Sequence, residues 1–420
     1  MKDFQQIKLY RYPLFIILIS YCFIEISNPF IGHFLQIIPR IKNSHLAIII
    51  AWLVLPKTLK TIILPKNKLF LALPFLIIIL IKTPFVDIMQ ENTIIAVVSE
   101  WIFYILYFPL FAKLFCTKDG RECFFISIGI SSIIGSLIFI IYLSGTSLMD
   151  NISSNSMAYL NVFGLPVALR GVFFKSGFER NFYFSALITL LFIAIFSGSR
   201  ANLVISTLQT LVFIFYFASF KKILLGGIII STLLLFLSSV ANIDQEKVEF
   251  RNKKFNRILN WKEDGSIFLR FALYTKASDI FSNNILMGAG WGSRTLSGIE
   301  GGLVEIESFS RGDYLDTAKK GLHSTYLRII SGTGLIGIIC FLYFLINNII
   351  YFIKIKFSLL KKIPEFFVFL SISIGIFINA FQNTMSFECF LIISSFIISA
   401  NLTLDNLRMI HLMKLKYYKI

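Results

Sequence analysis

The sequence predicts an all-α protein, a polytopic bundle of about twelve membrane-spanning helices with one large extracytoplasmic loop. Of its 420 residues, 56% are hydrophobic and 15% are charged, whereas about a quarter of a soluble domain is charged. The apolar residues form long continuous runs that do not alternate with period two, which favours helices over a transmembrane barrel. Basic residues recur in every second connection between these runs, which is typical of a chain that crosses a membrane repeatedly.

The predicted spans follow from the roughly 20 apolar residues that a helix needs to cross a bilayer. In chain order they are Tyr12–Ile24, His45–Leu55, Leu69–Ile81, Ile94–Phe115, Phe124–Leu143, Met157–Phe174, Phe182–Phe196, Ala201–Phe220, Ile223–Ala241, Tyr326–Phe352, Phe366–Phe381 and Met385–Ala400. The chain therefore divides into a bundle of about nine spans (1–241), a loop (242–322), and about three further spans with a cytoplasmic tail (323–420).

The basic residues set the predicted orientation. Lys and Arg precede the first span and follow the second, fourth, sixth, eighth, tenth and last spans. Cytoplasmic loops carry such an excess, and the intervening connections are neutral or acidic, as at Asp87 and Asp150. Both termini are therefore predicted to be cytoplasmic. This topology accounts for the net charge of +17, so the bilayer is an expected partner and nucleic acid is not.

The connection from about Asn242 to Leu322, which we call the long loop, is predicted to be functional. It far exceeds the 12–15 residues beyond which loops are usually functional or disordered. Its amphipathic stretches Glu246–Trp261 and Ile267–Phe281 predict some helix. We find no internal repeat, which weakly disfavours a repeat-built transporter.

Two arginines are candidates for binding an anion. Arg200 ends the run Ser197–Arg200 at the predicted outer junction of two spans. It could snorkel to the interface, or it could clamp phosphate oxygens with its guanidinium fork. Arg270 opens a segment of the long loop that leads into the glycine-rich run 287–292. A lone loop arginine is usually solvated, and this run is neither a phosphate-binding loop nor a dinucleotide fingerprint.

His323 is the candidate base. It stands where the long loop re-enters the membrane, with Arg328 and the glycine run 332–337 just behind it. An imidazole can accept a proton near neutral pH. A lone histidine is more often structural, and we interpret His33, His45 and His411 in that way. The glycines allow helices to pack closely, which is enough to explain them.

Other polar residues gather at the same predicted face. Any of them could contact sugar hydroxyls, and any could equally be interfacial: Lys82, Glu100, Asn155, Gln382, Asn383 and Glu388. The five cysteines are scattered without metal-ligand spacing, so neither a metal site nor a disulfide framework is expected.

Taken in order, these motifs resemble the O-antigen ligase/polymerase superfamily. They are Ser-Gly-Ser-Arg at 197–200, the Arg270 segment running into Gly-Ala-Gly-Trp-Gly at 288–292, and His-Ser-Thr-Tyr-Leu at 323–327 followed by Gly-Leu-Ile-Gly at 334–337. The resemblance covers residues 155–345 at the level of motifs and the remainder in topology only. Each motif is weak alone, and the ordered set is more specific.

The resemblance implies a glycosyltransferase of the GT-C type in a bacterial inner membrane. Such an enzyme uses glycans on undecaprenyl pyrophosphate, presented at the outer face of that membrane, and needs no metal or other cofactor. Arg200 and Arg270 match the arginines that would bind pyrophosphate, and His323 matches the histidine that would act as base on the acceptor hydroxyl. Arg328 and Asn155, at the same face, are predicted to bind substrate as well. A chain-length regulator protein is a further expected partner.

Three functions remain open from the sequence. A polymerase would extend a lipid-linked glycan into O antigen or a related surface polysaccharide, and a ligase would join the glycan to lipid A core. The polymerase is favoured for two reasons. His323-Ser324 stands where ligases commonly have His-Asn, and the chain is rich in Phe, Ile, Lys and Asn, a composition common among the polymerases that it resembles. A lipid-glycan transporter without catalysis is the third, although transporters place their polar residues near the bilayer midplane.

Overall fold

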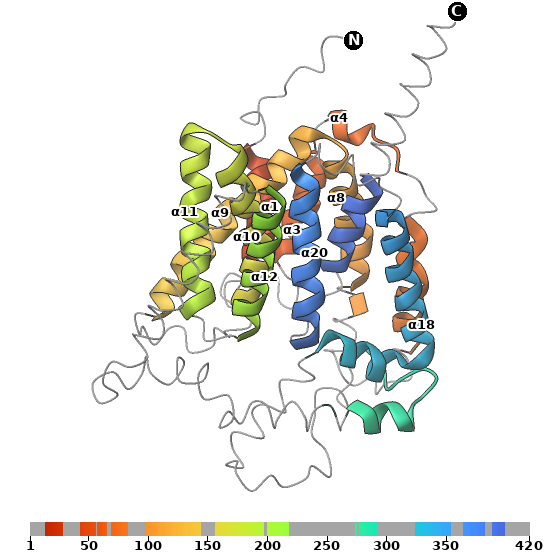
Figure 1. Cartoon of the computed structure of the whole chain (residues 1–420). Helices are drawn as coiled ribbons and strands as arrows, with labels where there is room; N and C mark the ends of the chain where they lie inside the picture. Colours follow the sequence, from red (N-terminus) through yellow and green to blue (C-terminus); the bar gives the residue numbers. More distant parts are fainter. Residues whose placement is uncertain are drawn as a thin grey trace, which may run out of the picture.

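The computed structural model describes residues 13–27, 43–55, 57–64, 69–82, 97–98, 100–143, 156–196, 200–217, 274, 277–291, 324–353, 364–382 and 389–399. Every regular element among them is a helix (Figure 1), which confirms the all-α prediction. The labelled elements are α1 (Pro13–Ser27), α3 (Asn43–Leu53), α4 (Lys57–Lys60), η2 (Phe70–Ala72), α6 (Leu73–Lys82), η4 (Phe103–Tyr107), α8 (Phe108–Phe115), α9 (Lys118–Leu143), α10 (Ser156–Phe174), α11 (Gly177–Phe196), α12 (Arg200–Phe217), α18 (Thr325–Ile353) and α20 (Pro364–Gln382). Residues 277–283 and 389–399 are also helical.

Each predicted span other than Ile223–Ala241, which lies outside the described residues, overlaps a helix. The helices extend past the apolar runs at their polar ends. For example, α9 begins at Lys118 and α11 at Gly177, each several residues before the predicted span. Asp119 and Glu179 occupy these first turns, where a negative charge suits the helix dipole. The apolar run therefore corresponds only to the part of each helix that is suited to lipid. The helix itself is longer, because its first turn includes polar residues.

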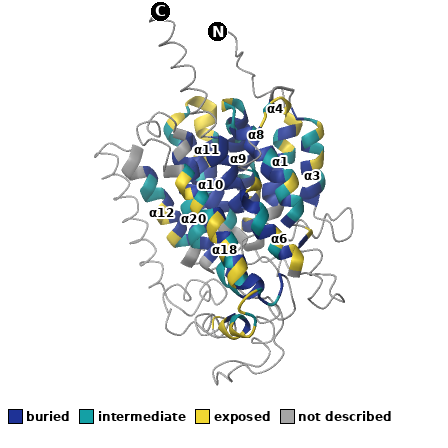
Figure 2. Cartoon of the chain, turned by 90° about the vertical axis from the view of Figure 1, so that its right-hand side faces the viewer, coloured by how far each residue is buried: buried dark blue, intermediate teal, exposed yellow. Residues whose placement is uncertain are grey.

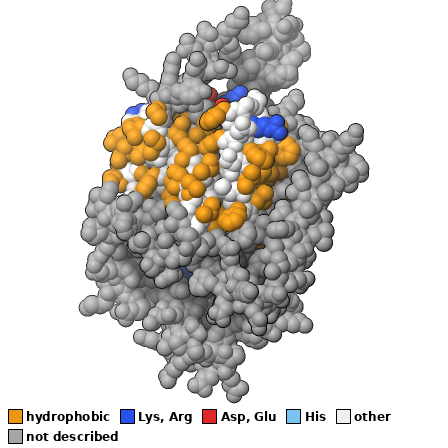
Figure 3. Space-filling model, turned by 90° about the vertical axis from the view of Figure 1, so that its left-hand side faces the viewer, with side chains coloured by type: hydrophobic (Ala, Val, Ile, Leu, Met, Phe, Trp, Pro, Cys, Tyr) orange, Lys and Arg blue, Asp and Glu red, His pale blue; other side chains and the backbone are white. Residues whose placement is uncertain are grey.

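Two of the described helices are long and apolar enough to cross a membrane by length and composition, Lys118–Ile140 and Thr325–Tyr351. The second carries a continuous exposed apolar stripe on its outer side (Figure 2), made of Leu335, Ile336, Ile339, Leu342, Tyr343, Ile346, Ile349 and Ile350. The face viewed in Figure 3 is likewise mostly hydrophobic where it is described, with charged side chains only near its upper edge. Apolar surface of this extent suits lipid better than water.

Helix α10 lies at the centre of the bundle, against α9, α11, α12 and α20, while α1 packs on α9 and α3, and α18 packs on α6 and α20. The connections from α10 to α11 and from α11 to α12 are only a few residues long, so these neighbours run antiparallel (Figure 1). The starts of α10 and α12 therefore share the lower end of the bundle in Figure 1, and α18 also starts there.

Stacked aromatic rings hold the middle of the bundle. The ring centroids of Phe369 in α20 and Phe396 in the helix 389–399 lie 3.7 Å apart, and the two rings are stacked. Phe124 also stacks on Phe369. Phe115 packs edge to face on both Phe369 and Phe124. Phe contributes 46 of the 420 residues, and aromatic pairs add packing energy beyond their buried area. The core thus fixes how α8, α9 and α20 meet.

The long loop is described only at residue 274 and over 277–291. Its helix 277–283 falls at the end of the predicted amphipathic stretch Ile267–Phe281. The other stretch, Glu246–Trp261, lies outside the described residues, as do the predicted domain boundaries near 241 and 322.

Candidate functional site

Two of the candidate site residues, Arg200 and Arg328, lie at helix starts at one end of the bundle. Arg200 is the first residue of α12, and Arg328 lies in the first turn of α18. Asn155 directly precedes α10, and His323 directly precedes Ser324 and α18. Asn155, His323 and Arg270 themselves lie outside the described residues, and of Arg200 only the backbone is described.

Side-chain contacts tie these helix starts together. Near the starts of α10 and α12, Asn161 Nδ2 donates to Asn202 Oδ1 at 2.7 Å. At the start of α18, Ser324 and Tyr326 bond to carbonyls of α20. Because the free N–H groups at a helix start carry partial positive charge, this end of the bundle is suited to an anion such as a phosphate.

Ser324 fixes the start of α18. Its Oγ accepts from the backbone N–H of Leu327 at 3.4 Å, as an N-cap does, and donates to the carbonyl of Ala380 in α20 at 3.2 Å. Tyr326 adds a second tie, from its hydroxyl to the carbonyl of Phe377 at 3.3 Å. Asparagine caps helices as well as serine does. Serine at position 324 therefore fills the capping role that an asparagine would have there.

Helix α18 is broken at Gly334, whose φ of 62° and ψ of −162° leave the helical region. The residues on either side of the break form backbone hydrogen bonds with residues 285–290 of the long loop. We call this contact the glycine joint. Ala289 N–H donates to Ser331 O at 2.8 Å and Gly290 N–H to Gly332 O at 2.9 Å, while Leu335 N–H donates to Ile285 O at 2.7 Å and Ile336 N–H to Leu286 O at 3.1 Å. Irregular backbone at a membrane is tolerated only where its polar groups are satisfied in this way.

The joint requires glycine on both sides. Gly288 has a φ of 66°, and a Cβ there would lie 2.4 Å from the carbonyl carbon of Gly332. A Cβ on Gly334 would lie 2.5 Å from the nitrogen of Gly288. The two glycine runs that the sequence analysis treated separately are thus one contact, in which the backbones approach too closely for any side chain.

Replacing Gly288 with alanine is expected to separate the long loop from α18, because the clashing atoms belong to the backbone and cannot rotate away. Gly177→Ala is the matched control: Gly177 has a similar φ of 55°, but a Cβ there meets nothing within 4 Å. Both variants carry the roughly 1–2 kcal/mol conformational cost of a left-handed residue. Protease cleavage of the long loop in oriented vesicles should accelerate in Gly288→Ala only. Equal cleavage rates in the two variants would contradict the joint.

Trp291 and Arg328 meet just beside the joint. The Trp291 side chain is 2% exposed, and the guanidinium carbon of Arg328 lies 4.4 Å from the centre of its ring. Phe75 of α6 packs edge to face on the same ring at 6.0 Å. Glu100, one of the outer-face residues in the sequence analysis, contributes a negative charge that acts on Arg328. The structure thus joins Arg328 to a residue of the glycine-rich run, a pairing that sequence spacing did not reveal.

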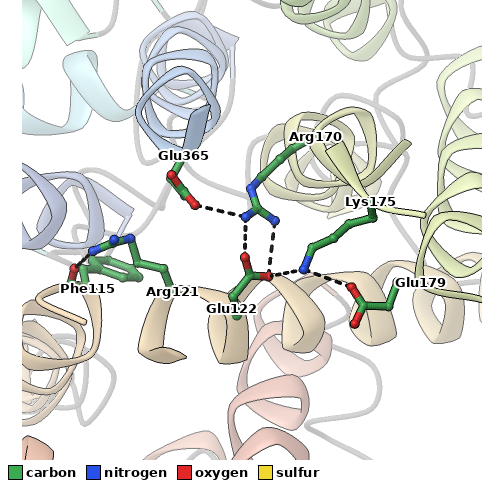
Figure 4. Close-up of polar contacts among 7 residues, drawn as sticks. All are labelled: Phe115, Arg121, Glu122, Arg170, Lys175, Glu179 and Glu365. Atoms are coloured by element: carbon green, nitrogen blue, oxygen red, sulfur yellow. Dashed lines mark hydrogen bonds and ion pairs between the residues drawn. The ribbon is translucent and has the colours of Figure 1, made fainter. Parts of the chain in front are cut away.

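The sequence analysis missed a buried ionic network at the opposite end of α10 (Figure 4). Arg170 pairs with Glu122 of α9 and, at 3.1 Å, with Glu365 of α20. All three residues are less than 10% exposed. Lys175 joins the network through Glu122 at 3.1 Å and Glu179 at 2.9 Å. One signal was available: Arg170 lies inside a predicted span, where an arginine is costly without partners.

Lys175 lies in the turn between α10 and α11. Its burial lowers its pKa, but hydrogen bonds and the charges of Glu179 and Glu122 outweigh that effect and raise the pKa above the ordinary lysine value. Lys175 therefore stays charged at any physiological pH. Each cation of the network is paired with two carboxylates, so we assign the network to holding α9, α10 and α20 together rather than to chemistry.

Comparison with known families covers the part of the chain that holds these features. Residues 185–342 match the model of a family described as O-antigen ligase. The match runs from α11 into α18, so it includes Arg200, Arg270, His323, Arg328 and the glycine joint. The comparison with curated proteins gives no match.

Proposed function

Because residues 185–342 place this part of the chain in the O-antigen ligase/polymerase superfamily, we propose that the protein is a membrane glycosyltransferase of the GT-C type. Its proposed activity is to polymerise undecaprenyl-pyrophosphate-linked repeat units into O antigen or a related surface polysaccharide. Members of the family are inner-membrane, glycosyltransferase-like enzymes that act on lipid-linked glycans. The observation that best supports the proposal is the grouping of the starts of α10, α12 and α18 at one end of the bundle, where an anionic donor can bind.

In the proposed reaction the acceptor hydroxyl attacks the anomeric carbon of the donor glycan. The bond from that carbon to the pyrophosphate oxygen breaks, and lipid pyrophosphate leaves with the bonding electrons. Arg200 and Arg270 stabilise the charge that develops on the leaving oxygens, and His323 takes the proton of the attacking hydroxyl. Asn155 and Arg328 bind substrate. The donor is already activated, so the reaction consumes no nucleotide.

The proposed topology places the site outside the cytoplasm. The chain crosses the inner membrane about twelve times, with both termini cytoplasmic and the long loop on the outer face. The ionic network, beside the basic connection at Lys175, then belongs to the cytoplasmic end of the bundle. A chain-length regulator stays a predicted partner.

A ligase is the second candidate, because the matching family covers both activities and does not distinguish between them. The capping role of Ser324 removes one argument against it, because Ser and Asn both satisfy the start of α18. Deleting the gene in its host separates the two activities. A surface-glycan ladder that collapses to core bearing one repeat unit identifies a polymerase, whereas bare core with long glycan on undecaprenyl pyrophosphate identifies a ligase. If every surface polysaccharide and the lipid-linked glycans were unchanged, the result would contradict both activities.

Arg200→Ala and Arg270→Ala are each expected to lower transfer by roughly 10²–10³-fold, the usual cost of removing one group that stabilises developing charge. The measurement is transfer between lipid-linked repeat units in proteoliposomes. Arg180→Ala is the matched control, because Arg180 is an exposed arginine near the opposite end of α11 and should leave the rate unchanged. Full activity in either site variant would remove that arginine from the mechanism.

A further inference from the structure

We propose that Trp291 is a positioning residue that presents the guanidinium of Arg328 to the pyrophosphate of the lipid-linked donor. This inference rests on the proposed function and deepens it, because it assigns Arg328 a defined part of the substrate and assigns the glycine joint a purpose. The long loop, through Trp291, completes the anion site at the start of α18.

The position of Trp291 is tightly determined. Gly290, the residue before it, donates its backbone N–H to Gly332 in the glycine joint. The indole ring is buried among core residues and packs against Phe75. The loop backbone and the bundle core therefore fix the ring from two sides, so the ring can in turn fix whatever lies against it.

Among the described residues, none accepts a hydrogen bond from the guanidinium of Arg328. Its guanidinium lies against the ring of Trp291, and its side chain is partly exposed. Within the described part of the chain, no carboxylate forms an ion pair with it. The charge of Glu100 acts on Arg328 from a distance, which lowers the cost of keeping a cation at this depth.

Arg170, in the same bundle, is an arginine whose terminal guanidinium N–H groups are already bonded to carboxylates. Arg170 also lies against an aromatic ring, with its guanidinium carbon 4.5 Å from the centre of Phe125. Its terminal N–H groups, however, are taken by Glu122 and Glu365. Both arginines have a ring against the guanidinium, but within the described residues the N–H edge of Arg328 meets no carboxylate and is available to the planar fork of bonds that a phosphate accepts.

A contact with an aromatic ring is better suited than an ion pair to orienting an arginine that must bind a phosphate. The attraction between a cation and an aromatic ring orients the guanidinium plane without using any N–H donor. A carboxylate partner would use two of them. An arginine oriented in advance loses less side-chain entropy when the ligand binds, so removing the ring should weaken binding even though Trp291 need not touch the ligand.

The test measures binding of undecaprenyl pyrophosphate to the full-length protein in nanodiscs. Trp291→Leu is expected to raise the Kd by roughly 5- to 30-fold, the loss of one desolvated cation–ring contact, and Trp291→Phe should recover part of it because it restores a ring. In the Arg328→Ala background, Trp291→Leu should have no further effect, because the two residues act as one unit.

Trp52→Leu is the matched control. Trp52 also has a cation over its ring, Lys113 at 5.9 Å, but it bonds to Leu106 elsewhere in the bundle, and its loss should leave the Kd unchanged. A Kd in Trp291→Leu equal to that of the wild type, or an effect that adds fully to that of Arg328→Ala, would overturn the inference while leaving the proposed function standing. A wild-type protein that does not bind undecaprenyl pyrophosphate would overturn both.

Discussion

Replacing His323 with alanine is expected to lower the rate of glycan transfer by about 10²–10⁴-fold, the usual contribution of a positioned general base. The expected loss is in the chemical step, because without the imidazole the acceptor hydroxyl must attack with its proton still attached. Transfer between lipid-linked repeat units, measured in proteoliposomes with donor at saturation, reports this step. The melting temperature of the variant in detergent should stay close to that of the wild type.

The neighbouring residue supplies the control for His323. Ser324→Asn should retain activity, because asparagine caps the helix start that Ser324 caps. Ser324→Ala should lose about 1 kcal/mol of stability with the cap and shift the position of residue 323. If His323→Ala were as active as Ser324→Asn, the base would have to be sought elsewhere at this end of the bundle.

Replacing Arg170 with alanine is expected to destabilise the bundle by about 3–5 kcal/mol, the cost of removing one partner from a buried charge network. Glu122 and Glu365 would then be left in the bundle without their shared cation. The measurement is unfolding of the purified protein in a titration with denaturing detergent. Binding of undecaprenyl pyrophosphate below the unfolding range should be unaffected, because Arg170 lies about 20 Å along α10 from the proposed site, at 1.5 Å per residue.

A compensated variant distinguishes lost pairing from lost packing. The triple variant Glu122→Gln, Arg170→Met, Glu365→Gln removes all three charges and should recover most of the stability, since neutral groups of similar size often replace buried ion pairs without loss. Lys175→Ala should cost far less than Arg170→Ala, because the side chain of Lys175 is 23% exposed and partly exposed pairs contribute little. A triple variant as unstable as Arg170→Ala would show that shape, not charge, holds α9, α10 and α20 together.

The helices could be predicted from the sequence because each depends on a local pattern. A long apolar run favours a helix regardless of what surrounds it, so the runs at 124–143 and 326–352 were located within a few residues of α9 and α18. The helix ends were displaced, since polar first turns continue a helix beyond its apolar part. The break at Gly334 was not predicted, because a glycine within an apolar run also suits an unbroken helix packed closely on a neighbour.

The sequence by itself determined the helical class, the candidate arginines and histidine, and the match of residues 185–342 to a family model, because these depend on residue type and order along the chain. Only the tertiary structure decided which of these residues meet. It joined the glycine run of the long loop to the break in α18, set Trp291 against Arg328, and closed Arg170 between two carboxylates. The physical reason is that these contacts join residues distant in sequence, and their geometry is fixed by the packing of whole helices rather than by any local preference.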